Sequence, residues 1–195
     1  PLTDADKTAL KRVKASMEPL SLEGKQPFEF EYILPDIAFS GKENFGTRMI
    51  YLFSGLYQKS FDVDSEVYCP DSLLESYSRV GINAIYTQGV LYMPSEFPFE
   101  PALSVGYEKR LENLKKLTER CAKYGIKVFL YLNEPRSMNK AFFDKYPYIQ
   151  GHVEDDDHIC MCTSTKEVQD YIKNAVATIC QNAPLLGGFF CMAKS

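Results

Sequence analysis

The chain has 195 residues, of which 45% are hydrophobic and 25% charged, and its formal net charge is −4. A slightly acidic chain of this kind lacks the basic face that binding to nucleic acid requires, so we expect no nucleic-acid partner. No apolar run is long enough to cross a membrane, so we expect no membrane association. No signal peptide is visible, which favours the cytoplasm but leaves the cellular compartment open.

Residues 1–46 differ in pattern from the rest of the chain. A helix rich in lysine and alanine is expected from Asp4 to about Met17. The segment Phe28–Leu34 then alternates apolar with charged residues before Pro35, as an edge strand does. We therefore predict two parts: an N-terminal α+β extension, or the remnant of a preceding domain, over 1–46, and a second domain over 47–195.

From about Arg48 onward, apolar runs alternate with amphipathic stretches. The runs predict buried strands and the amphipathic stretches predict the helices between them. The strands are expected at 48–53, 82–86, 127–132 and 187–192, and the helices at 71–80, 107–124, 139–146 and between Ser164 and Pro184. Asp71 is the expected N-cap of the first helix, and Ser164 and Glu167 form the expected capping box of the last.

Helices between apolar strands imply right-handed crossovers and a parallel sheet. Two architectures fit this α/β pattern: a small doubly wound sheet with an unrelated ligand, and part of a TIM-type barrel. Ser54–Tyr57, after the first strand, lacks the G-x-G-x-x-G spacing of a dinucleotide site, and no cofactor is expected. Polar residues end three strands, and barrel active sites lie at that rim. The sequence thus favours a partial (β/α)8 TIM-type barrel of about four βα units with parallel strands.

The end of the third strand carries the best candidate site. A carboxylate, an amide and a guanidinium lie within four residues there. Glu134 is the candidate catalytic residue, because a carboxyl group can act in acid/base or nucleophilic chemistry. The remaining residues are candidates for substrate binding: Asn133, Arg136, Gln88, Tyr131 and Arg48. An alternative is that Glu134 and Arg136 form a structural ion pair, and that Arg48, at the start of a strand, lies at the opposite, stabilising end of the barrel.

The six cysteines are too sparse for a disulfide scaffold, and several fall on apolar faces, so we expect most to be buried thiols. His152, His158, Cys160 and Cys162, with Asp155–Asp157 between them, are zinc ligands by residue type. However, no C-x-x-C knuckle is present. Cys160 and Cys162 lie in a strand-like piece that leads to a helix cap, and packing is their favoured role. No metal is therefore expected.

Several segments together resemble a group of bacterial TIM-barrel proteins related to glycoside hydrolases of the β-hexosaminidase type. The segments that carry the likeness are Tyr131–Met138, Cys160–Gln169 and Leu186–Phe190, with Val80–Tyr86 and Tyr124–Val128 as strand entries. The match covers roughly residues 48–195, and Asn133–Arg136 is its most distinctive part. The resemblance implies the N-terminal half of such a barrel, with a polar, sugar-like substrate held at the strand ends.

In the related hydrolases the acid/base residue lies at the end of the fourth strand, a point that corresponds here to Ala193–Ser195. The resemblance therefore implies a fragment of a glycoside hydrolase that is inactive as it stands, with the acid beyond Ser195. The alternative is a non-catalytic carbohydrate-binding or interaction domain. Because the chain has no Trp, stacking on a sugar would fall to Tyr or Phe. The expected partners are a carbohydrate and, through exposed strand edges, the chain itself.

Overall fold

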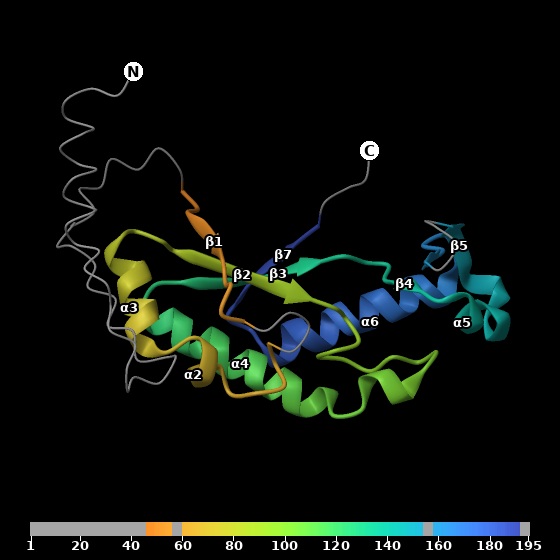
Figure 1. The fold of residues 1–195 in the computed structure, drawn as a ribbon, viewed down its shortest axis with the longest axis horizontal. Helices are drawn as coiled ribbons and strands as arrows, with labels where there is room; N and C mark the ends of the chain where they lie inside the picture. The colour runs from red at the N-terminus through yellow and green to blue at the C-terminus, as the bar shows by residue number, and fades with distance from the viewer. Residues whose placement is uncertain (1–45, 56–59, 154–157, 192–195) are drawn as a thin grey trace, which may run out of the picture. The chain divides into compact units, whose positions relative to one another are not determined.

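The structure is a computed structural model, and it describes residues 46–55, 60–153 and 158–191 (Figure 1). The helix expected from Asp4 and the alternating segment Phe28–Leu34 lie outside these residues, so the N-terminal extension and its boundary remain predictions. In the described ranges, no helix is both long enough and apolar enough to span a bilayer.

Four strands form one parallel sheet in the order β1-β2-β3-β7 (Figure 1). Their bounds are β1 Met49–Tyr51, β2 Ala84–Gly89, β3 Lys127–Leu132 and β7 Leu186–Phe190. Each strand after β1 pairs with the parallel strand that precedes it in the chain, so the crossovers step across the sheet in one direction. A doubly wound sheet reverses direction at a switch point, and these four strands have no such reversal. The predicted α/β class and the four parallel strands are confirmed, and the order is consistent with a partial TIM-like fold.

Helices follow the strands and lie along one side of the sheet (Figure 1). They are α2 Ser65–Tyr68, α3 Asp71–Arg79, α4 Tyr107–Lys123 and α6 Lys166–Asn182. Residues three or four apart form the buried stripes of the two long helices, which is the spacing of one helix face. The stripes comprise Leu111, Leu114, Leu117 and Cys121 on α4, and Val168, Tyr171, Ala175 and Ile179 on α6.

A second, antiparallel sheet lies between β3 and α6 in the chain, in the order β4-β6-β5. Its strands are β4 Ser137–Met138, β5 Gln150–Val153 and β6 Ile159–Met161. Two short elements lie between β4 and β5 in the chain, α5 Lys140–Lys145 and the 3-10 turn Pro147–Ile149. They contribute three buried apolar side chains: Phe142, Phe143 and Ile149. Another 3-10 turn, Pro101–Ser104, precedes α4. Of this sheet the sequence predicted only the strand-like piece around Cys160.

Both predicted helix caps are wrong. The N-cap of α3 is Pro70, and Asp71 is its first helical residue, with its carboxylate accepting a hydrogen bond from Arg120 of α4 at 2.5 Å. The N-cap of α6 is Thr165, whose hydroxyl donates to the carbonyl of Cys162 at 2.8 Å. Because α6 starts one residue later than expected, Glu167 is its second residue rather than its third, and the capping box cannot close.

The two sides of the parallel sheet differ in how deeply their side chains are buried. On the side covered by the helices, Ile85, Val128 and Leu130 are fully buried. On the other side, alternate residues of the same strands, such as Tyr86 and Tyr131, are only half-buried. We call this second side the open face, because none of the described helices covers it.

The expectation that most cysteines are buried is wrong. Cys69 and Cys121 are buried, Cys160 and Cys162 are half-buried, and Cys180 and Cys191 are exposed. The last two lie outside the apolar stripe of α6 and beyond the end of β7.

Candidate functional site

Two predicted binding residues meet at the carboxyl end of the open face. Gln88 of β2 and Tyr131 of β3 are register partners in neighbouring strands, so their side chains lie on the same face. Both are half-buried. The structure therefore brings together two side chains that are far apart in the sequence, at the rim where barrel enzymes carry their sites.

An aromatic row on the open face includes Tyr131 of this pair. We define it as Tyr51, Tyr86, Phe190 and Tyr131. The rings of Tyr131 and Phe190 have centroids 5.2 Å apart, and those of Phe190 and Tyr86 are 5.0 Å apart. The ring centroids of Tyr86 and Tyr51 are also 5.0 Å apart. Since β3 lies between the strands of Tyr86 and Phe190, their contact shows that side chains converge over the middle of the open face.

The row and Gln88 offer complementary chemistry. Aromatic faces pack against apolar C–H surfaces, while a phenol hydroxyl and a carboxamide both donate and accept hydrogen bonds. A small number of polar groups set in an aromatic surface is typical of a binding site for a small polar molecule. The arrangement can hold and orient such a ligand.

Glu134 occupies a different position. Its Oε1 accepts a hydrogen bond from the backbone N–H of Leu91 at 2.8 Å, and its Oε2 accepts one from the backbone N–H of Arg136, also at 2.8 Å. Leu91 follows β2 and Glu134 follows β3, so the carboxylate ties together the loops after two neighbouring strands. Burial raises the pKa of Glu134 above its ordinary value, and the two N–H bonds oppose part of that rise. The hydrogen bond to Arg136 comes from its backbone rather than from its guanidinium.

The Glu134 carboxylate lies near a buried residue of the helix layer. Burial, and after it the charge of Glu134, raise the pKa of Tyr171, a residue of α6 that is 3% exposed. Because α6 packs on the covered side, Glu134 lies near that layer, whereas Gln88 and Tyr131 are on the open face. The predicted catalytic residue and the predicted binding pair are therefore at the same end of the sheet, with Glu134 near the helix layer and Gln88 and Tyr131 on the open face.

The other predicted residues divide between the two ends of the sheet. Asn133 is exposed and Arg136 half-buried, both in the loop after β3. Arg48 is at the amino end: its backbone N–H donates to Asn83 Oδ1 at 2.7 Å, and its guanidinium donates to the carbonyl of Gly81. The prediction that Arg48 binds substrate together with the other candidates is therefore wrong. Both of its partners precede β2, so Arg48 lies at the opposite end of the sheet from Gln88 and Tyr131.

The zinc pattern does not assemble in the part of the chain that the structure describes. No three side chains of His, Cys, Asp or Glu come together there in a way that could hold a metal ion. The hydroxyl of Ser137 lies 3.3 Å from the sulfur of Cys160, as a strand neighbour. Asp155–Asp157 lie outside the described residues.

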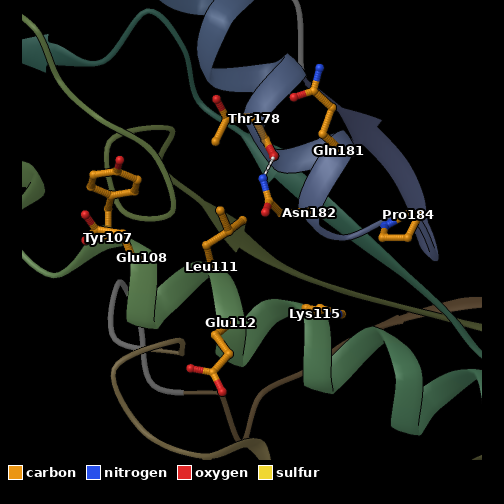
Figure 2. Close-up of a pocket in the computed structure, with 9 residues that line it drawn as sticks. All are labelled: Tyr107, Glu108, Leu111, Glu112, Lys115, Thr178, Gln181, Asn182 and Pro184. Carbon is orange, nitrogen blue, oxygen red and sulfur yellow. Dashed lines mark hydrogen bonds between the residues drawn. The ribbon is translucent and has the colours of Figure 1, made fainter.

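Two features of the structure were not predicted from the sequence. One is Phe190 in the aromatic row, which strand alternation next to Phe189 could have indicated. The other is a groove of about 530 Å³ between α4 and α6, in which Leu111 faces Asn182 (Figure 2). Sequence patterns carry no signal for such a groove, because it forms where two helices distant in the chain cross.

Comparisons with known proteins add little to this site. No protein-family model matches the chain, and no curated protein matches it. One similar solved structure is that of a noncanonic maltogenic alpha-amylase from Thermotoga neapolitana, with a TM-score of 0.48 and 16% identity over 75% of this chain. The chain covers 38% of the length of that amylase chain.

Proposed function

We propose that this chain is part of a carbohydrate-active protein of the TIM-barrel class and holds a sugar at the carboxyl end of its open face. The observation that carries the proposal is the placement of Gln88 beside Tyr131, next to Phe190. A pyranose ring presents C–H bonds on its faces and hydroxyl groups at its rim. The aromatic rings can pack against the C–H faces of the sugar, and the Gln88 amide can form hydrogen bonds with its hydroxyl groups.

The barrel part of the proposal is supported by the stepwise order of the parallel strands and by helices on a single side of the sheet. The finer assignment, to the N-terminal half of a barrel related to β-hexosaminidase-type hydrolases, rests on the sequence resemblance around Asn133–Arg136. No comparison with known proteins contributes to that finer assignment.

Two roles for Glu134 follow from two versions of the proposal. In a glycoside hydrolase, Glu134 is one of the two carboxyl groups that cleave the O-glycosyl bond, and a raised pKa suits a general acid. In a carbohydrate-binding domain without catalysis, Glu134 fixes the loops that border the sugar. The second version is favoured by the bonds from Leu91 and Arg136, since both carboxylate oxygens already have partners.

Calorimetric titration with a panel of oligosaccharides tests the shared claim. We expect Tyr131→Ala and Gln88→Ala each to weaken binding at least about tenfold, the effect of losing one stacking or hydrogen-bonding group in a site. Tyr148→Ala is the matched control, because Tyr148 is 57% exposed and lies outside the open face. Equal affinity of all four proteins for every bound sugar would refute the proposal.

Product analysis of the same sugars separates the two versions. The hydrolase version requires cleavage that Glu134→Gln abolishes. The binding version requires that the sugar is bound and recovered intact. Cleavage that persists unchanged in the Glu134→Gln variant would exclude the catalytic role of this residue.

We further propose that the chain associates with itself through strand edges. In the described part of the sheet, β1 and β7 are the edge strands, each with one hydrogen-bonded neighbour. Unpaired backbone groups on an edge favour pairing with another chain. Sedimentation velocity should show a concentration-dependent dimer, and a monomer at all concentrations would contradict this proposal.

A further inference from the structure

One aromatic ring at the open face lies almost entirely in solvent. Phe53 follows β1 and is 82% exposed, the largest fraction among the large hydrophobic side chains that the structure describes. Leu52, the residue before it, is fully buried on the covered side. The ring of Phe53 meets that of Tyr51 edge to face, with centroids 4.6 Å apart. Because Tyr51 belongs to the aromatic row, Phe53 continues that row by one ring.

Phe53 lies at the same end of the sheet as the proposed sugar site. Parallel pairing joins Tyr51 to Tyr86, and the N–H of Leu52 continues this pairing by donating to the carbonyl of Tyr86 at 2.8 Å. Phe53 is two residues beyond Tyr51, just as Gln88 is two residues beyond Tyr86. Register pairs carry this level from Gln88 through β3 to β7. We call it the rim level, and it comprises Phe53, Gln88, Tyr131 and Phe190.

The rim level is wider than one sugar ring. Neighbouring strands of a sheet lie about 4.8 Å apart, so the three steps from β1 to β7 span about 14 Å. A pyranose that stacks on Tyr131 beside Gln88 occupies only part of this width and leaves Phe53 uncovered. A single exposed apolar side chain needs no explanation, but an exposed ring that continues an aromatic surface beside a polar group is typical of a ligand-binding site. The ring of Phe53 is therefore available to a second sugar unit.

We propose that the site takes an oligosaccharide of at least two sugar units rather than a single sugar, with one unit on Tyr131 and another on Phe53. This inference rests on the proposed function, because it extends the same site. Each of the two rings offers an aromatic face to the C–H bonds of one unit. Gln88 is on β2, between the strands of the two rings, and its amide can donate to and accept from the hydroxyl groups of either unit. Phe53 is thus the residue that selects the longer ligand.

Calorimetric titration with sugars of increasing length tests this inference. The probes are glucose and N-acetylglucosamine, together with the malto-, cello- and N-acetylchito-oligosaccharides of two to four units. In the series that binds, we expect an oligosaccharide to bind at least about tenfold more tightly than its monosaccharide, which is the effect of one further stacked ring. Phe53→Ala should remove this gain and leave the affinity for the monosaccharide unchanged.

Two variants serve as controls. Phe53→Tyr keeps an aromatic face at this position and should retain the gain in affinity with length. Tyr148→Ala removes an exposed ring outside the open face and should retain it as well. Because the Phe53 side chain is largely in solvent, its variants should melt at the temperature of the unmutated chain.

The possible failures are distinguishable. Binding of a monosaccharide that depends on Gln88 and Tyr131, with no gain on lengthening, would overturn this inference and leave the proposed function standing. A gain that survives in Phe53→Ala would overturn it equally. Loss of a dimer in sedimentation velocity of Phe53→Ala, with unchanged sugar affinities, would assign the ring to self-association along β1 instead. If no sugar of any length binds, the proposed function and this inference fail together.

Discussion

The two faces of the parallel sheet differ although the same strands supply both. Leu130 and Tyr131 are consecutive residues of β3, yet Leu130 is fully buried against the helices and Tyr131 lies half-buried on the open face. The covered face is mainly aliphatic, although Thr87 and Phe189 also lie on it, and the open face carries the aromatic row and Gln88. This division teaches that alternate residues of one strand differ in their contribution to packing. If the open face holds a ligand as proposed, substitutions of neighbouring residues should separate an effect on stability from an effect on binding.

The largest expected effect is on the covered face. Leu130→Ala removes a fully buried side chain and should lower the free energy of unfolding by about 2 to 5 kcal/mol. Tyr131→Ala, one residue later, should lower it by about 1 kcal/mol, because its ring is partly in solvent. Urea denaturation of the two variants measures the difference. Equal losses of unfolding free energy in the two variants would contradict the difference between the two faces.

The next largest expected effect on the free energy of unfolding comes from Glu134→Gln. The amide places an N–H₂ group opposite a backbone N–H of Leu91 or Arg136, which removes one hydrogen bond and leaves a buried donor without an acceptor. We expect a loss of about 1 to 3 kcal/mol in the free energy of unfolding. Asn133→Ala is the control from the same loop, and because Asn133 is exposed it should change stability by less than about 0.5 kcal/mol. An unchanged stability of the Gln variant would show that the carboxylate does not tie the loops.

Gly187→Ala tests the packing of the open face. A Cβ at Gly187 would lie 2.8 Å from Cε2 of Phe129 and 3.0 Å from Cβ of Lys127. Because the Phe129 ring borders the open face and can turn aside, we expect a loss of only about 1 kcal/mol. The double variant with Phe129→Ala should be less sensitive to the added methyl group. A loss of several kcal/mol would show that the open face is as tightly packed as the covered one.

The smallest expected effect is a pH dependence. Burial raises the pKa of Glu134 in the folded chain above its unfolded value, so the folded state binds the proton more tightly. Its contribution to stability is fully present below the unfolded pKa and is lost as the pH rises through the folded pKa. Between pH 4 and pH 7, about the range above the ordinary carboxyl pKa, the unmutated chain should therefore lose stability relative to Glu134→Gln. A relative gain over that range would reverse the sign and contradict the burial of this carboxyl group.

Strands and long helices could be predicted from the sequence because their periodicity is local. The N-cap of α3 could not be predicted in this way, because the Asp71 carboxylate accepts a hydrogen bond from Arg120 on another helix instead of capping its own. The two- and three-residue strands β4 and β6 are too short to show a period. A strand pattern also does not give the direction in which a loop turns its side chains.

The candidate site shows the same limit. That Gln88 and Tyr131 lie together could be predicted, because residues at the carboxyl ends of parallel strands meet. The same rule places Glu134 at that end, but it gives no sign that the Glu134 carboxylate accepts the N–H of Leu91.

Mapping of backbone amide chemical shifts during titration with an oligosaccharide tests the central claim most directly. If the open face holds the sugar, the largest changes will fall at Tyr86, Gln88, Tyr131 and Phe190, and Gln88→Ala will reduce them. Changes that cluster instead on the groove between α4 and α6, or no changes with any sugar, would contradict the account.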